Sequence, residues 1–399
     1  MPESWIELGL MSGSPPDPDK VIDQAGYDKA PNQRWAHLHM RELFPTARVA
    51  RGERVSVLPR DERDLSTFAF HSRGRDCTLA GMMEETYVDG LMVVHDGAVV
   101  FEHYAEGMTP ETTHICQSVS KSLTAALAGV LVGQGRFDVE RTVPDYIREL
   151  AGTCWDGCSI QHLLDMTAGV SFDESDYEDE DSESFKGFRI MGWIPRLPDD
   201  PMPAEYIANM RRQAEHGAEF EYRSVLTDVL GWCIERATGE RLADAFSREV
   251  WAPMGAAQDA DFVIGPAGFP LTDGGFCVTL QDLARFGLMY LQGGRIDGRQ
   301  VVPAAWVQRL RLSDPGLVAM YAAAEGSEAE PGAFYHDKWW IADAEAGIYA
   351  GLGIHGQQVL VHHPSRTVVA CFSTWPRPTI DEYHELVTEG LLALCGSPV

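Results

Sequence analysis

Two short apolar runs lie on either side of a tight turn early in the chain. Residues 91–94 read Leu-Met-Val-Val and residues 98–101 read Ala-Val-Val-Phe, and Asp96-Gly97 lies between them. Asp-Gly between two apolar runs is a strong signal of a β-hairpin, because both residues tolerate a positive φ. The pattern therefore predicts an antiparallel pair of strands over residues 90–104.

The apolar spacing then changes to the helical period, with apolar residues at i, i+3 and i+4. A first helix is expected to begin near Ser118 and to end at Gly133-Gln134-Gly135, because glycine commonly closes a helix. From about residue 140 to 320 helical patterns dominate, with clear examples at 160–166, 227–236 and 280–289.

Strand patterns return late in the chain, at 358–363 and 367–372, and a closing helix is expected over about 380–395. The β-rich ends thus enclose a helical middle. We expect an α+β fold, in which helices flank an antiparallel sheet built from both ends and a mainly helical domain is inserted. The predicted divisions are an extended arm (1–60), a sheet domain (61–140 and 321–399) and the mainly helical domain (141–320).

The composition narrows the classes of function. The chain has 399 residues, of which 45% are hydrophobic, and a formal charge of −28. Such a chain repels nucleic acid and anionic membrane surfaces. No apolar run approaches the ~18 residues needed to cross a bilayer, and no export signal is visible at the start. We expect a cytoplasmic protein that acts on a small molecule; a homodimer is left open.

Eight cysteines are scattered along the chain, mostly in apolar surroundings. Reduced, buried thiols are therefore expected. Cys154 and Cys158 have a loose ligand spacing but lack a second pair, so neither a metal nor a cofactor is expected.

The segment Ser118-Val119-Ser120-Lys121 opens the first predicted helix. Residues three apart share a helix face, so Ser118 and Lys121 would lie side by side at the first turn. A serine nucleophile needs a nearby base or a lowered pKa, and burial readily tunes a lysine. The non-catalytic alternative is a serine that caps the helix beside a lysine on the surface. Lysine is scarce here, however, with five against 27 arginines.

Further parts of a hydrolytic site occur later in the chain. Tyr222 lies at the mouth of a predicted helix, where a nearby cation such as Lys121 would favour its phenolate; packing on the core is the alternative. The glycines of 351–356 let the backbone approach a substrate closely, which suits a donor to an oxyanion.

Together these motifs resemble the serine β-lactamase-like family, which includes class C β-lactamases, DD-peptidases and a branch of esterases. The resemblance is greater to the branch that hydrolyses linear nylon-oligomer amides (6-aminohexanoate oligomers), and it extends over most of the chain. The segments that carry it, besides Ser118-x-x-Lys121, are 32–37, 220–222, 273–275, 338–340, 353–357 and 373–376.

The resemblance implies roles for individual residues. Ser118 is the acylated nucleophile, Lys121 its hydrogen-bonded partner and Tyr222 the general acid and base. The backbone N–H groups of Ser118 and Ile354 form the oxyanion hole. At the substrate site the resemblance implies Tyr177, which contacts the scissile amide from a loop, together with Asp273 and His355; for His355 a structural role is the alternative.

The chain also departs from the family pattern. Ser224 stands where many relatives have asparagine, and no Lys-Thr-Gly is present at the third motif. Phe188 stands near the position where the oligomer hydrolases offer an acid to the substrate's amine, and Asp273 replaces an amide side chain. These departures imply a different substrate preference and argue against efficient turnover of β-lactams.

The resulting hypothesis is a serine hydrolase that cleaves small linear amides or esters, such as 6-aminohexanoate oligomers, through an acyl-enzyme on Ser118. The alternatives are a carboxylesterase with weak β-lactamase or DD-peptidase activity, and a catalytically silent binding protein. The run 173–183 holds eight carboxylates in eleven residues. It predicts a solvated loop, with a lid over the cleft or a calcium site as the other interpretations.

Overall fold

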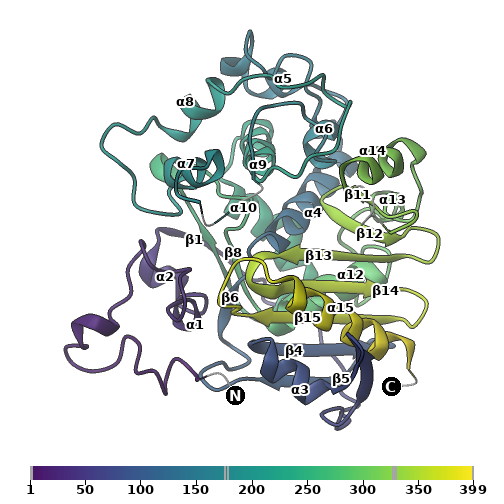
Figure 1. Ribbon diagram of the computed structural model, residues 1–399. Helices are drawn as coiled ribbons and strands as arrows, with labels where there is room; N and C mark the ends of the chain where they lie inside the picture. The colour runs from purple at the N-terminus through teal and green to yellow at the C-terminus, as the bar shows by residue number, and fades with distance from the viewer. Residues whose placement is uncertain (1–2, 175–176, 178, 326–329, 398–399) are drawn as a thin grey trace.

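Two distant parts of the chain build one seven-stranded antiparallel sheet in the computed structural model, which describes residues 3–174, 177, 179–325 and 330–397. Figure 1 shows this sheet with its strands running nearly horizontally. The strand order is β11 (Phe334–His336), β12 (Trp339–Asp343), β13 (Ile348–Gly353), β14 (Gln357–His362), β15 (Thr367–Ser373), β4 (Val88–His95) and β5 (Ala98–Tyr104).

The pairing of β15 with β4 joins the late strands to the early hairpin. Val369 lies opposite Val93 in the register, and both are fully buried. A strand covered on both faces carries a continuous apolar run, as β4 does. Asp96 and Gly97 adopt positive φ values of 51° and 83° at the hairpin turn. The predicted hairpin and the predicted sheet from both ends are confirmed.

Helices cover both faces of the sheet. On one face lie α15 (Asp381–Gly396) and α3 (Leu79–Glu85), whose apolar side chains pack on the central strands. On the other face α12 (Leu280–Leu291) packs against β15, β14 and β4. Helix α12 lies within the predicted helical domain of 141–320, but it packs directly on the sheet. The layers around the sheet therefore include residues from that range. The domain division itself stays a prediction.

The remaining elements are all shorter than α4 (Val119–Gly133), and many of the helices lie on the side away from β5 (Figure 1). No helix in the described part of the chain is long and apolar enough to cross a membrane.

A second sheet has the strand order β1 (Thr46–Val49), β7 (Ala260–Val263), β8 (Phe276–Thr279) and β6 (Thr113–Ile115). Two small hairpins also form: β2 (Ala69–Ser72) pairs with β3 (Arg75–Thr78), and β9 (Arg295–Ile296) pairs with β10 (Arg299–Gln300). The other helices are α1 (Gln33–Ala36), α2 (Met40–Leu43), α5 (Val143–Tyr146), α6 (Ile160–Leu164), α7 (Glu183–Met191), α8 (Pro203–Ala208), α9 (Val225–Thr238), α10 (Leu242–Phe246), α11 (Ala252–Met254), α13 (Ala304–Arg309) and α14 (Pro315–Glu325). Single turns are η1 (Pro18–Lys20), η2 (Arg148–Leu150), η3 (Ser247–Trp251), η4 (Pro266–Gly268) and η6 (Ile354–Gly356).

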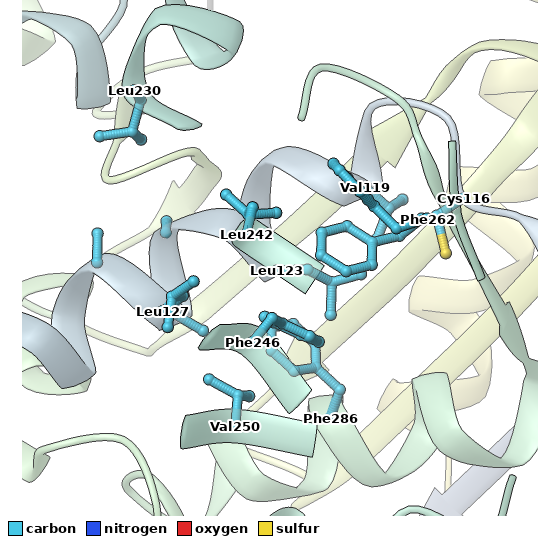
Figure 2. Close-up of a cluster of buried hydrophobic side chains, with 14 of the residues drawn as sticks. Cys116, Val119, Leu123, Leu127, Leu230, Leu242, Phe246, Val250, Phe262 and Phe286 are labelled. Carbon is cyan, nitrogen blue, oxygen red and sulfur yellow. The ribbon is translucent and has the colours of Figure 1, made fainter. Parts of the chain in front are cut away.

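The helix α4 runs through the centre of the molecule. Every residue from Val119 to Leu131 is buried, as expected of a helix that is apolar all round. Figure 2 shows Val119, Leu123 and Leu127 of α4 in one cluster with side chains from α10 and α12. Both ends of α4 match the sequence prediction. Because α4 is buried along most of its length, the core holds the segment that carries Ser118 in place.

The contact between α12 and the sheet can be tested at Gly287. A Cβ on Gly287 would lie 2.5 Å from Cγ1 of Val368 and 2.9 Å from Cγ2 of Val359. Gly287→Ala should therefore lower the free energy of unfolding by about 1–3 kcal/mol through overpacking, although alanine is the better helix former. Urea denaturation measures the effect. Gly396→Ala in α15, where a Cβ meets nothing within 4 Å, is the matched control; equal effects would contradict the close contact.

Candidate active site

Ser118 is presented to solvent at the start of α4. It is the only residue between His114 and Leu131 that is not buried. The preceding residue, Gln117, has a φ of +45°, a left-handed conformation that non-glycine residues rarely adopt. This turn places Ser118 at the N-cap of α4, where the positive end of the helix dipole favours a developing negative charge.

Lys121 lies directly beside the serine. Its Nζ donates hydrogen bonds to Ser118 Oγ at 2.6 Å and to the backbone carbonyl of Asp273 at 2.9 Å. Burial acts to lower the pKa of Lys121, but its interactions with Tyr222, Glu174 and Asp273 outweigh burial and raise the pKa above its ordinary value. Lys121 is therefore a cation at neutral pH.

Tyr222 completes the group from a segment just before α9. The backbone N–H of Glu221 donates to the carbonyl of Met166 at 3.0 Å and fixes that segment. Nζ of Lys121 lies 5.0 Å from the centroid of the Tyr222 ring, and Trp340 stacks on the same ring with centroids 5.4 Å apart. Burial raises the pKa of Tyr222, and the charge of Lys121 opposes this only in part, so the phenol is protonated at neutral pH.

The end of β13 passes close to the serine backbone. A Cβ on Gly353 would lie 3.0 Å from Ser118 N and 2.8 Å from the carbonyl oxygen of Cys116, so only glycine allows this approach. Ile354 follows in η6 and lines the same cavities as Ser118. The structure thus brings Ile354 to the nucleophile, while its part in an oxyanion hole stays a prediction.

Two cavities meet at Ser118. The first cavity has a volume of about 310 Å³, and the second cavity one of about 60 Å³. Ser118, Tyr177 and Ile354 line both cavities. The other lining residues set them apart, because the first contains Tyr222, Trp340, Leu352 and Trp375, whereas the second contains Asp28, Glu174, Phe188, Trp193 and Asp273.

Glu174 is a site residue that the sequence analysis missed. Its carboxylate accepts hydrogen bonds from the hydroxyl of Ser224 at 2.5 Å, from the backbone N–H of Ser224 and from the hydroxyl of Tyr177 at 2.8 Å. Its charge also raises the pKa values of both Lys121 and Tyr222. The only signal in the sequence was its place in the acidic run 173–183, where it resembles its neighbours.

The acidic run is not uniformly solvated. Residues 175, 176 and 178 lie outside the described residues, and Glu180 and Asp181 are exposed. Glu174 and Tyr177, in contrast, face the second cavity. The Tyr177 ring stacks on Phe188 of α7 with centroids 5.9 Å apart, so this part of the run borders the site.

Asp273 lies behind Lys121 and borders the second cavity. Its carboxylate accepts from the indole Nε1 of Trp193 at 3.2 and 3.3 Å, and its backbone N–H donates to Asp228 at 3.0 Å. Burial raises the pKa of Asp273 to about 6, although the charge of Lys121 opposes the shift. Burial and Asp273 also raise the pKa of Asp228 well above its ordinary value.

His355 lies behind the site and is not among the residues that line the two cavities. Its Nδ1 is 2.7 Å from the carbonyl oxygen of Trp375, and its ring meets that of His37 edge-on, with centroids 5.0 Å apart. Burial lowers the pKa of His355 to about 4. The structure thus places a neutral histidine where it holds η6, away from the substrate space.

A buried network of charges lies near the segment that carries Tyr222. Nδ1 of His336 is 2.8 Å from Asp165, and Nε2 is 3.3 Å from Asp337. These three groups have a geometry that could hold a metal ion, but the guanidinium of Arg309 binds Asp337 at 2.6 Å. Asp337 and Asp165 raise the pKa of His336 to about 9 against the effect of burial. An imidazolium and a guanidinium therefore neutralise the two carboxylates.

Comparison with known proteins supplies relatives over nearly the whole length. The family model described as Beta-lactamase matches residues 78–388. The chain is 36% identical over 374 residues to the 6-aminohexanoate-dimer hydrolase of Paenarthrobacter ureafaciens. The aligned region covers 92% of this chain and 91% of that protein.

Solved structures agree in fold. A Bacillus anthracis protein, provisionally a 6-aminohexanoate-dimer hydrolase, superposes with a TM-score of 0.85 at 25% identity, covering 96% of this chain and 98% of the other. A family VIII carboxylesterase gives a TM-score of 0.58 at 15% identity, covering 79% and 95%. The predicted α+β, β-lactamase-like fold is confirmed.

The His336 network predicts a pH dependence of stability. Because the folded pKa of about 9 exceeds the unfolded value of about 6.5, the stabilisation is complete below pH ~6.5 and is lost as the pH rises through about 9. Relative to wild type, His336→Gln should lose on the order of 3 kcal/mol near pH 6 and much less near pH 10. Urea denaturation at both pH values tests this. His71→Gln, in an exposed pair with Asp76, should change little at either pH.

Proposed function

The chain belongs to the β-lactamase family and is a serine hydrolase of the amide or ester type, and we propose that it forms an acyl-enzyme on Ser118 and cleaves small linear amides or esters. The observation that carries the proposal is the 2.6 Å hydrogen bond from the buried Lys121 ammonium to Ser118 Oγ, at the junction of two cavities. A nucleophile, a tuned cation and a substrate space then coincide.

In the proposed reaction the pair formed by Tyr222 and Lys121 first loses one proton to solvent. Ser118 Oγ then attacks the carbonyl carbon, and its proton passes to that pair. The backbone N–H groups of Ser118 and Ile354 stabilise the negative charge on the carbonyl oxygen. Tyr222 then protonates the leaving amine or alkoxide as its bond to carbon breaks. Water attacks the acyl-enzyme, and its proton returns through the same pair to Ser118 as the acid is released.

The residues that line the two cavities support a placement of the two halves of the substrate. The general acid must reach the leaving atom, and Tyr222 lines the first cavity but not the second. The leaving group therefore lies in the first cavity and the acyl part in the second. Three carboxylates, Asp28, Glu174 and Asp273, border the second cavity, which supports an acyl part with an amino end, as in a 6-aminohexanoyl unit. Phe188 has no negative charge to pair with such an amino end, whereas Asp28 and Glu174 can supply one.

A carboxylesterase with weak β-lactamase or DD-peptidase activity is the second candidate. None of the described residues that line the two cavities selects an amide over an ester, which favours this candidate. The carboxylesterase named above also has the same fold. Gly351-Leu352-Gly353 stands where β-lactamases have Lys-Thr-Gly, so no cation is available there for a β-lactam carboxylate. Rapid hydrolysis of short-chain esters beside slow hydrolysis of nitrocefin would favour this candidate, whereas rapid hydrolysis of nitrocefin would instead indicate a β-lactamase or DD-peptidase.

The nucleophile can be tested by labelling. A serine-reactive phosphonate should modify Ser118 alone, and Ser118→Ala should reduce turnover of p-nitrophenyl esters and of linear 6-aminohexanoate dimers by more than about a thousandfold. Mass spectrometry of the digested protein locates the label. Ser120→Ala is the matched control, because its hydroxyl accepts from Phe276 N within the core. Label on another residue, or residual activity in folded Ser118→Ala, would sink the proposal.

The proton-transfer pair predicts an alkaline rise in rate. Both Lys121 and Tyr222 have raised pKa values, so kcat/KM should increase as the pH rises and the pair loses a proton. Since Glu174 raises both pKa values, Glu174→Gln should move the rise to lower pH. Profiles of kcat/KM against pH measure the shift. Asp181→Asn removes an equal charge at an exposed position and should leave the midpoint in place; an unmoved or higher midpoint in Glu174→Gln would contradict the model.

A further inference from the structure

An apolar strip leads away from the catalytic serine along the outer face of β13. Side chains alternate between the faces of a strand. Gly351 faces α4, because a Cβ there would lie 2.9 Å from Ser122 Oγ and 3.5 Å from Val119. Ile348, Ala350 and Leu352 therefore face the opposite side, where all three are partly exposed.

Helix α15 forms one wall beside this strip. His384, Thr388 and Leu392 are spaced four residues apart and so lie on one helix face, and all three border a groove of about 480 Å³ together with Ile348, Ala350 and Leu352. Leu392 at the far end is 40% exposed. We call this space the β13 groove and define it by these six residues. Trp340 of β12 also lines it.

The β13 groove is continuous with the first cavity. Trp340, Leu352, Gln358 and His384 line both spaces, and Trp340 stacks on Tyr222. From Leu352 to Ile348 the strand advances about 13 Å, at about 3.3 Å per residue. The groove thus extends the space next to the general acid well beyond the volume of the first cavity.

The chemistry of the groove suits an uncharged chain. Its described lining includes no lysine or arginine, and its ionisable side chains are those of Glu330, His384 and two tyrosines. Burial of an alkyl chain on this surface is favourable by about 0.8 kcal/mol per methylene, which equals about a fourfold gain in binding.

We propose that the β13 groove binds the leaving-group side of a linear, uncharged substrate, so that the enzyme prefers long alkyl chains on the amine or alcohol that departs. This rests on the proposed function, since Tyr222 must reach the leaving atom in the first cavity. It adds a subsite on one side of the scissile bond and assigns none to the acyl side.

Two matched ester series test the proposal. In one, acetate is esterified to linear alcohols of increasing length; in the other, linear acids of increasing length are esterified to methanol. The value of kcat/KM in the alcohol series should rise by up to about fourfold per methylene until the groove is full. The acid series should show no comparable rise, because its uncharged chain enters the second cavity, which the carboxylates of Asp28, Glu174 and Asp273 border.

Ala350→Phe should fill the groove and flatten the rise in the alcohol series, leaving the dependence on acyl length as in wild type. Ala151→Phe, at an exposed position outside the described cavities, is the matched control and should keep the rise. Leu392→Glu places a charge at the exposed end of the groove and should weaken binding of the longest alcohols only. This second variant decides the matter if Ala350→Phe fails to fold.

A flat alcohol series in wild type, or equal effects of Ala350→Phe on both series, would overturn the assignment. Hydrolysis of ethyl acetate that depends on Ser118 would show, in that case, that the proposed function stands while the groove does not bind substrate. Loss of hydrolysis throughout, in folded wild-type protein, would instead count against the proposed function.

Discussion

The buried ammonium of Lys121 is the constraint on which the rest of the site depends. Lys121 is 1% exposed, and taking a charge out of water costs several kcal/mol unless it is well paired. Its partners come from three separate parts of the chain: the Ser118 hydroxyl, the Asp273 carbonyl and the face of the Tyr222 ring. Each must be in place before the cation is stable, so the charge that assists the reaction also fixes the geometry around it.

The same constraint accounts for the carboxylates nearby. Glu174 and Asp273 compensate the cation electrostatically, and both contribute to its raised pKa. Burial in turn raises the pKa of Asp273 to about 6 and raises the pKa of Asp228 well above its ordinary value. The site is thus a balance of buried groups, in which the protonation of one carboxyl is coupled to the charge of its neighbour.

Sequence analysis predicted the parts of the molecule that depend on local pattern. The hairpin of β4 and β5, helix α4 and the pair of Ser118 with Lys121 follow from spacing alone, because neighbours three residues apart on a helix meet wherever that helix packs. The position of Glu174 depends instead on how a loop of similar acidic residues folds back on Ser224, and the sheet contact of α12 depends on which strands it meets. The resemblance implied His355 at the substrate site, with a structural role as the alternative. In the structure His355 has a φ of +60°, and its ring packs against that of His37.

The order of the chain has a consequence for how the enzyme is made. Helix α4 and its pair of Ser118 and Lys121 are synthesised early, whereas Gly353 and Ile354 lie near the other end of the chain. Strand β4 also waits for β15, its partner in the sheet. Contacts so distant in sequence form slowly, and a chain still on the ribosome has its nucleophile but no completed substrate space. Activity therefore requires the last strands, because most of the residues that line the first cavity lie between Trp340 and Val387.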